Sequence, residues 1–133
     1  MAVIDPGWRW AEPFCYSQAM RAGDLLFISG QAAIAPDGTV VGRGDFDAQA
    51  DQALRNLEAV LRTAGGSLRD VLKVTIFLTD MGNFPRVVEL RRRWFSPPYP
   101  ADTIVEVQAL ALPELMVEIE AVARIGREAG SPV

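Results

Sequence analysis

The sequence predicts an α+β fold, or a mixed α/β layer, in which two helices pack on one face of a sheet. Two observations carry this prediction. Segments with a period of two residues alternate with two segments of helical period, and turns containing glycine or proline separate them. The resulting order is strands, helix, strand, helix and two strands, which leaves the second face of the sheet without a cover.

The first elements are expected to be antiparallel strands. The run Leu25–Gly30 is too short for a helix and is bounded by turn residues, so it indicates a buried strand. Residues 16–20 are expected to pair with it across a turn at 21–24. A further turn signal at Pro36-Asp37-Gly38 predicts a short hairpin around that turn.

The first helix is predicted over residues 45–64. Apolar residues recur there every three or four positions, and Gly65-Gly66 supplies the stop. The opposite side carries two acid–base pairs at i,i+4, each worth only about 0.3–0.5 kcal/mol. This side is therefore expected to be solvated; the pairs are Asp51 with Arg55 and Glu58 with Arg62.

A strand and a second helix follow. Residues 72–78 alternate between apolar and more polar side chains, which indicates a strand. The second helix is predicted to begin near Pro85, a favoured first-turn residue, and to end before Ser96-Pro97-Pro98. Its three consecutive arginines, 91–93, point about 100° apart from one residue to the next, so they are expected to lie on a solvated face.

The last two predicted strands carry acids on one side only. Asp102 and Glu106 share the even side of the first, and Glu118 and Glu120 share the even side of the second. The odd sides are mostly apolar and suit the face beneath the helices. The acids are therefore expected on the uncovered face.

The surroundings of these acids depend on strand pairing. If the two strands form a hairpin, Glu106 lies near Glu118 and Asp102 near Val122, with Arg124 one diagonal step away. Like charges opposite each other destabilise a sheet, so something must compensate them. One interpretation is a wet outer face on which Arg124 pairs with Asp102. The other is a subunit interface with a polar cleft, favoured by the apolar residues between the acids: Ile104, Met116 and Val122.

Composition excludes several classes of protein. The 133 residues are expected to form one domain, residues 1–133, and the net charge of −4 argues against nucleic acid or an anionic membrane as partner. No signal peptide or membrane span is apparent, so a cytoplasmic location is expected. The chain has no histidine, and its single cysteine, Cys15, is expected to be a buried inert thiol. Neither a metal site nor a cofactor is expected, and any proton transfer must use carboxylates, Tyr, Lys, backbone groups or water.

Four motifs stand in order along nearly the whole chain: Tyr16–Ala19, Gly23–Gln31, Val74–Met81 and Val117–Ala123. Together, at this spacing, they closely resemble the RidA/YjgF family of imine and enamine deaminases. The resemblance implies a chorismate-mutase-like (YjgF-like) fold and a homotrimer whose sheets form a central barrel, with sites in clefts between subunits. It also implies hydrolysis of a small 2-imino acid to a 2-oxo acid and ammonia, without metal or cofactor.

By position, the resemblance gives Glu118 the role of handling water and places Tyr16 at the cleft. Gly30 matches a strand-end glycine whose backbone contacts ligand. Asp102 stands where imine deaminases carry an arginine that clamps the substrate carboxylate. Further substrate-binding candidates are Thr103, Ile104, where many members carry cysteine, and Trp94.

Three hypotheses remain open on the sequence. The first is a hydrolase that has lost the carboxylate clamp and acts on a neutral or cationic imine, enamine or related C=N compound. The second is an ordinary 2-iminobutanoate/2-iminopropanoate deaminase whose clamp comes from Arg124, Lys73 or one of the arginines 91–93. The third is a noncatalytic trimeric module that binds a metabolite or a protein.

Overall fold

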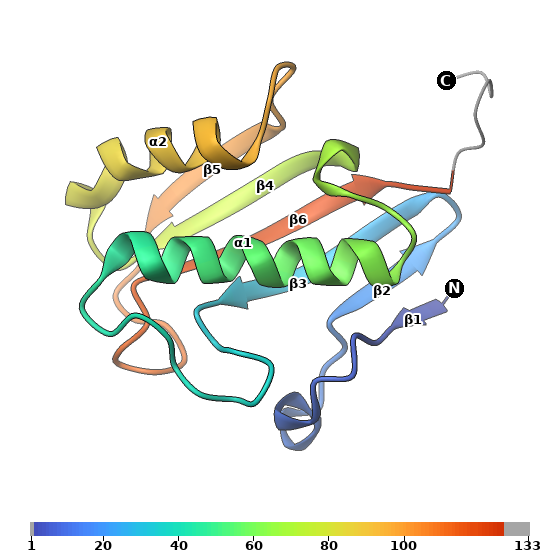
Figure 1. Cartoon of the computed structure of the whole chain (residues 1–133), viewed down its shortest axis with the longest axis horizontal. Helices are drawn as coiled ribbons and strands as arrows, with labels where there is room; N and C mark the ends of the chain where they lie inside the picture. The colour runs from blue at the N-terminus through green and yellow to red at the C-terminus, as the bar shows by residue number, and fades with distance from the viewer. Residues whose placement is uncertain (1, 127–133) are drawn as a thin grey trace.

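The computed structural model describes residues 2–126, which form a six-stranded sheet with two α-helices on one face (Figure 1). The strands are β1 (Ala2–Ile4), β2 (Ala19–Ala22), β3 (Leu25–Ala32), β4 (Val71–Leu78), β5 (Ala101–Glu106) and β6 (Val117–Arg124), and the helices are α1 (Phe46–Thr63) and α2 (Phe84–Trp94). Three 3₁₀ turns complete the order: η1 (Arg9–Phe14), η2 (Leu68–Asp70) and η3 (Met81–Asn83). The predicted α+β class and the placement of both helices on one face are confirmed.

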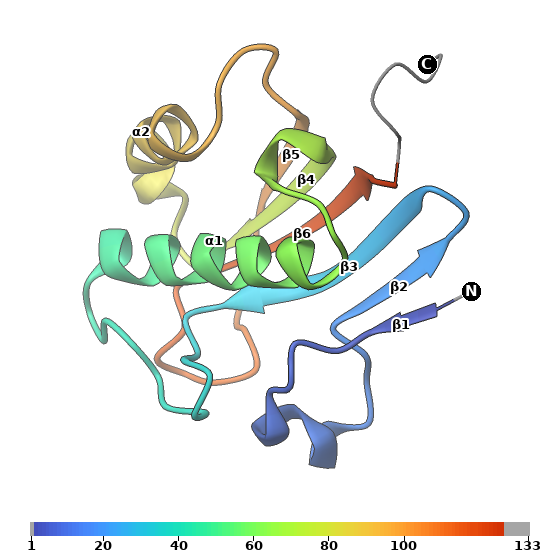
Figure 2. The ribbon, with the colours of Figure 1, turned by 45° about the vertical axis from the view of Figure 1, so that its right-hand side comes forward.

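The sheet is mixed. Its strand order is β1-β2-β3-β6-β4-β5, and β4 with β5 is the parallel pair. The other pairs are antiparallel. The turned view in Figure 2 shows α1 and α2 on one side of the twisted sheet, with β1 and β2 extending beyond the helices. The opposite face carries no element of the described chain.

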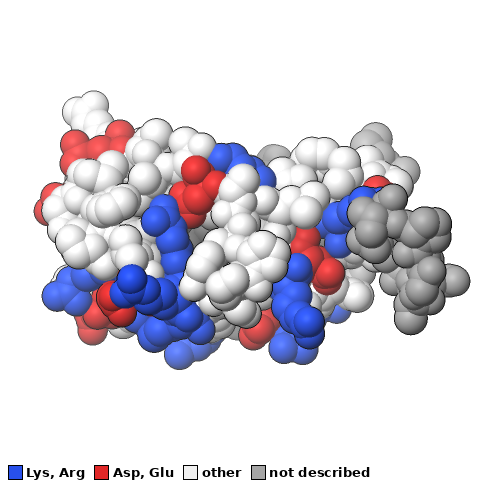
Figure 3. Space-filling view, turned by 90° about the horizontal axis from the view of Figure 1, so that it is seen from above, with Lys and Arg blue, Asp and Glu red and all other residues white. Residues whose placement is uncertain are grey.

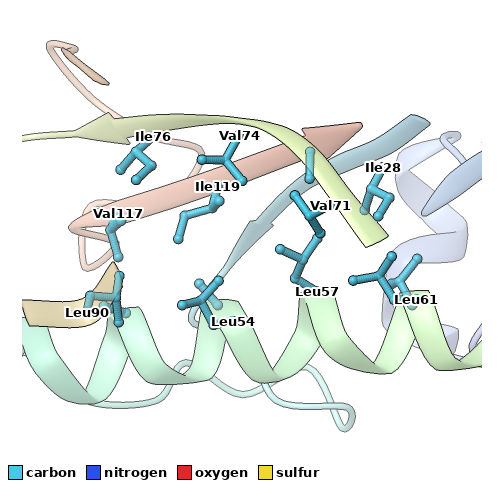
Figure 4. Close-up of a cluster of buried hydrophobic side chains, with 14 of the residues drawn as sticks. Ile28, Leu54, Leu57, Leu61, Val71, Val74, Ile76, Leu90, Val117 and Ile119 are labelled. Atoms are coloured by element: carbon cyan, nitrogen blue, oxygen red, sulfur yellow. The ribbon is translucent and has the colours of Figure 1, made fainter. Parts of the chain in front are cut away.

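The core lies between α1 and the middle of the sheet. Leu54, Leu57 and Leu61 of α1 point toward Val74 of β4 and Ile119 of β6, as Figure 4 shows. The helix begins where Asp45 accepts a hydrogen bond from the backbone N–H of Ala48, which satisfies one of the free donors of the first turn. The predicted apolar stripe is therefore confirmed as the buried face.

The predicted hairpin between the last two strands is wrong. β6 lies between β3 and β4, whereas β5 pairs with the far side of β4 as an edge strand. The connection from Glu106 to Val117 carries the chain past β4 to the middle of the sheet. Asp102 therefore lies opposite Val74, and Glu106 opposite Leu78, so neither is a neighbour of β6.

The prediction that all the acids share the uncovered face is also wrong. Asp102 is in register with Val74, a buried core residue, so its side chain lies on the helix-covered side. Glu118 is in register with Phe77 and lies on the uncovered side, as expected. An edge strand is only partly covered by α2, and Arg91 of that helix is within reach, so a carboxylate is tolerated there.

Three expectations about single side chains are corrected. Asp51 does not pair with Arg55 but accepts hydrogen bonds from the side chains of Arg93 and Trp94, at 2.7 and 2.8 Å, whereas the predicted pair of Glu58 and Arg62 is present at 3.5 Å. Cys15 is exposed, not buried. Arg91 is partly buried against Asp102, whereas Arg92 and Arg93 are exposed as expected, although each also contacts an acid.

Candidate functional site

Glu118, Tyr16 and Gly30 lie together around one cavity of about 490 Å³. The cavity lies at the end of β3 and the start of β6, and residues of η1 and of the 111–115 loop close its sides. Its volume falls in the range of pockets that hold small molecules, about 300–1,000 Å³. The remaining lining is largely apolar, with side chains such as Trp10, Phe14, Ile34, Leu112 and Leu115.

Gly30 provides the space that the Glu118 carboxyl group occupies. β3 is irregular between Ile28 and Gln31, where its register against β6 shifts, and Gly30 lies inside this irregularity. A Cβ at position 30 would lie 2.7 Å from Cδ of Glu118 and 2.8 Å from its Oε2. Only glycine therefore fits beside the carboxyl group in this arrangement.

The Glu118 carboxylate is poorly compensated. No side chain or backbone group among residues 2–126 donates a hydrogen bond to it or forms an ion pair with it. Partial burial raises its pKa above the ordinary value, and the negative charge of Glu120 raises it further. A carboxylate held ready without a partner, beside a cavity, is available to accept a proton from a bound molecule or water.

A chain of buried amides fixes Tyr16 at the rim. Gln31 donates through Nε2 to Oε1 of Gln18 at 2.9 Å, and Gln18 donates through Nε2 to the phenol oxygen of Tyr16 at 3.2 Å. Both glutamines are buried, so the chain holds the phenol in one place. Because the phenol oxygen accepts this bond, its hydrogen is left to donate elsewhere.

Two polar side chains of α1 hold the walls of the cavity. Asn56 donates through Nδ2 to the carbonyls of Ala32 and Ile34, at 2.9 and 2.8 Å, where the chain leaves β3. Gln49 donates to the carbonyl of Glu114 and accepts from the N–H of Met116, both at 2.8 Å. The loop that carries Leu112 and Leu115 is thereby tied to the helix.

The N-terminal segment supplies a wall that sequence reasoning did not single out. Trp10 and Phe14 of η1 both line the cavity. Trp10 packs directly on the turn at Gly38, since a Cβ there would lie 2.9 Å from Cβ of Trp10, and Gly38 has a φ of +91°. The aromatic cluster Trp8, Trp10 and Phe14 was visible in the sequence, but it has neither helical nor strand period.

Asp102 belongs to a different region. Arg91 of α2 donates through Nε and Nη2 to its two carboxylate oxygens, at 2.9 and 2.8 Å. Its side chain is 18% exposed and that of Arg91 26%, although the edge-strand backbone of Asp102 is open. The pair borders a mainly apolar cavity of about 400 Å³ between α2, the sheet and residues 99–100. The expected pair of Asp102 with Arg124 is wrong, because Arg124 donates to Asp24 at 2.6 Å.

The other substrate-binding candidates do not border the Glu118 cavity within one chain. Thr103 accepts a hydrogen bond from Lys73 on the uncovered face. Ile104 packs against the core from the edge strand. Trp94 donates to Asp51 and lines a polar hollow beside Pro97 and Pro98.

Charges of both signs lie side by side on one face of the molecule. Figure 3 shows Lys and Arg side chains in groups on the face seen from above, with Asp and Glu side chains next to them. Within residues 2–126, no three His, Cys, Asp or Glu side chains are placed to hold a metal ion. None of the helices described is long and apolar enough to cross a membrane.

Comparison with known proteins gives consistent matches. The family model described as endoribonuclease L-PSP matches residues 11–125. A RutC family protein of Pyrococcus horikoshii is 44% identical over 108 residues, which are 81% of this chain and 85% of that protein. The chloroplastic Reactive Intermediate Deaminase A of Arabidopsis thaliana is 34% identical over 83% of this chain and 58% of its own length.

Solved structures agree with these matches. The crystal structure of RidA from the Antarctic bacterium Psychrobacter superposes with a TM-score of 0.78 at 40% identity, covering 84% of this chain and 89% of that one. The predicted resemblance and the predicted YjgF-like fold are thus confirmed.

Proposed function

Because the chain belongs to the endoribonuclease L-PSP family, to which the RidA/YjgF proteins it resembles also belong, we propose that it hydrolyses a C=N bond of an imine, enamine or related compound. The observation that carries the proposal is the Glu118 carboxylate, which borders a cavity of substrate size without a partner among residues 2–126. Its raised pKa brings it nearer to the pH at which a general base works well.

In the proposed reaction, Glu118 accepts a proton from water while the water oxygen bonds to the carbon of the C=N group. The nitrogen gains a proton, for which the Tyr16 hydroxyl is a donor at the rim, and a carbinolamine forms. Glu118 then returns its proton to the amine, the C–N bond breaks, and the carbinolamine hydroxyl gives its proton to the Tyr16 phenolate. A carbonyl compound and ammonia leave, and both side chains are back in their starting protonation states. An enamine enters the same sequence after protonation on carbon.

The substrate is proposed to lack the carboxylate of a 2-imino acid. Asp102 is bonded to Arg91 and lies outside the Glu118 cavity, and no Lys or Arg among residues 2–126 lines that cavity. The lack of a positive charge there favours a neutral or cationic C=N compound over an anionic one. Arg124 and Arg93 are likewise bonded to acids.

An ordinary 2-iminopropanoate deaminase is the second candidate. It is supported by Lys73, which donates a hydrogen bond to the hydroxyl of Thr103 and lies on the same face of the sheet as Glu118. In an assembly, Lys73 of a neighbouring subunit is the cation to consider as a clamp. A noncatalytic binding module is the third candidate, and it requires the same cavity but no turnover.

The assembly is proposed to be a homotrimer with sites at subunit interfaces. The uncovered sheet face exposes the large apolar side chains of Phe27 of β3 and Val105 of β5, with charged residues of β6 and β4 between them. A sheet face that no helix covers and that exposes large apolar side chains supports an interface there. Light scattering during size-exclusion chromatography measures the mass. A monomer at micromolar concentration would remove this part of the proposal.

The activity is tested by ammonia release from a panel of imines made with and without a carboxylate. We expect acceleration of the neutral imines by the wild-type protein and little acceleration by Glu118→Gln. Glu89→Gln is the matched control, because Glu89 is an exposed glutamate of α2 that does not border the cavity. Inertness toward the whole panel would overturn the proposal, whereas a preference for 2-iminopropanoate would favour the second candidate.

A further inference from the structure

We infer that η1 forms a specificity wall, through Trp10 and Phe14, for a substrate whose C=N carbon carries a large apolar substituent, with an aromatic ring as the best fit. The inference rests on the proposed function in taking a C=N compound as the occupant of the Glu118 cavity. Beyond that function, the inference specifies which substituent the C=N compound carries.

The first argument is the division of the cavity. The lining divides by element: Glu118 of β6 lies beside Gly30 of β3, and Tyr16 adds a phenol oxygen. The sides formed by η1, residue 34 and the 111–115 loop are apolar. A ligand with one reactive polar group and one apolar body matches this division, whereas a substrate as small as acetone imine leaves the apolar part empty.

The second argument is that η1 is held in place. Ala11 is buried, and Trp8, which precedes the turn, packs against the main core, so the N-terminal half of η1 is anchored. Trp10 rests on the backbone of Gly38, whose positive φ and missing side chain allow that approach. β1 pairs with β2 and ties the preceding residues to the sheet edge. The wall is therefore preformed, which limits the ordering cost of ligand binding.

The third argument is the exposure of Phe14. Its side chain is 69% exposed although it borders the cavity, and neighbouring Leu112 and Tyr16 are also exposed. Large apolar side chains gathered at a cavity rim are typical of a binding surface. A phenyl ring placed between Phe14 and Leu112 removes apolar area of all three from water.

The test uses stable carbonyl products as probes: acetone and benzylacetone, which differ by an apolar arm ending in a phenyl ring. Binding is followed by NMR titration of the indole N–H resonances. Trp10 reports on the cavity, and Trp94, whose indole bonds to Asp51, is an internal reference. We expect benzylacetone to bind at least about tenfold more tightly than acetone, since a single methylene in a fitted apolar pocket is worth about tenfold or more.

Three variants separate the wall from general effects. Phe14→Ala is expected to reduce the preference for benzylacetone about tenfold, and Phe14→Leu less, with acetone binding nearly unchanged. Phe84→Ala, at an exposed phenylalanine of α2 that does not border the cavity, is the matched control and should leave the preference intact. Because Phe14 is exposed, its replacement is not expected to unfold the protein.

Equal binding of the two ketones, or a preference that Phe14→Ala leaves unchanged, would overturn the inference. A preference that depends on Phe14 in a protein without ammonia release would support the wall while removing the proposed hydrolysis. Equal rates of ammonia release from small and large imines would support the proposed hydrolysis and remove the specificity wall.

Discussion

Glu118 and Asp102 lie on opposite faces of one sheet, and they differ in the position of their strand and in their hydrogen-bond partners. Glu118 projects from a central strand, lacks a partner among residues 2–126 and has a raised pKa. Asp102 projects from the edge strand and receives two hydrogen bonds from Arg91. The sequence places both in acid-rich strands of similar pattern.

The difference separates a reactive group from a structural one. A carboxylate whose two oxygens are already bonded to a guanidinium is stabilised as an anion and gains little from taking a proton. A carboxylate kept beside a cavity without donors costs stability, and this cost is retained where the group does chemistry. We therefore propose that Glu118 takes part in turnover, whereas Asp102 ties the edge strand to α2 through Arg91.

The largest expected effect is on the rate of hydrolysis. Glu118→Gln keeps the size of the side chain and removes the base, so kcat/KM should fall about 10²–10⁴-fold, the usual contribution of general acid–base catalysis. Asp102→Asn should change the same constant for a neutral imine by less than about tenfold, because its carboxylate is occupied by Arg91. Steady-state ammonia release measures both. Comparable losses in the two variants would erase the distinction between the two carboxylates.

The second effect concerns the space beside Glu118. In Gly30→Ala the new methyl group overlaps the position of the Glu118 carboxyl carbon, 2.7 Å away, so the carboxyl group must move. A displacement of about 1 Å of a catalytic group can cost about 10²-fold in rate, and we expect a loss of that order in kcat. Gly82→Ala is the control, because Gly82 has no positive φ, does not border the cavity, and a Cβ there would meet only the Asp80 carboxylate, at 3.0 Å. Rates near wild type in Gly30→Ala would show that Glu118 need not occupy its present position.

Glu118 and Asp102 also show how much of the fold and of the site the sequence could predict. Period-two and period-3.6 patterns are local, so they predicted the strands and helices and the face on which Glu118 lies. The order of strands in a sheet depends on the path of the connections between them, which is not a local property. No pattern in the sequence showed that residues 107–116 carry the chain past β4 to the centre of the sheet. The wrong pairing of Asp102 with Arg124 follows from that. Its wrong face has another cause, because the apolar side of this edge strand, with Val105, lies on the uncovered face and not beneath the helices.

Trp10 and Phe14 were missed for a different reason. A 3₁₀ turn of six residues repeats no face often enough to give a periodic signal, and its contact with Gly38 joins segments far apart in sequence. The placement of Glu118 beside Gly30 came from resemblance, and the β3 irregularity that creates their contact is invisible in the residue pattern.

The third effect is on stability. Arg91→Met keeps much of the side-chain length but leaves the half-covered Asp102 carboxylate without its donor. We expect a loss of about 1–2 kcal/mol, or roughly 4–10 °C in Tm for a chain of this size. Arg86→Met is the matched control on the same helix, because its pair with Asp47 is more exposed, at 58% and 46%, and exposed pairs contribute under about 1 kcal/mol.

Thermal unfolding at equal protein concentration measures both variants. Adding Asp102→Asn to Arg91→Met should restore part of the loss, because the unpaired charge is then removed. Equal Tm values for Arg91→Met and Arg86→Met would mean that the Asp102 pair is no more than a surface contact.

The smallest expected effect is on the pH dependence of protein stability, in which Glu118 and Asp102 should differ. Burial and Glu120 raise the folded-state pKa of Glu118, so the folded protein holds this proton more tightly than the unfolded chain does. The contribution of Glu118 to stability is therefore most favourable below its unfolded-state pKa and is lost as pH rises through the raised folded-state pKa. Glutamine does not titrate and avoids this loss.

The Tm of Glu118→Gln should consequently exceed that of the wild type at pH 7–8 by a small margin, and the margin should shrink toward pH 4 as Glu118 takes up its proton. Asp102→Asn should behave oppositely at neutral pH, with a lower Tm, because it replaces an anion bonded to Arg91. Differential scanning calorimetry from pH 4 to 8 gives both curves. A Glu118→Gln variant that is less stable at pH 7 than at pH 4, relative to wild type, would mean that the Glu118 carboxylate is compensated in solution. In that case Glu118 would not be an unpartnered base, and it would not differ from Asp102 in this respect.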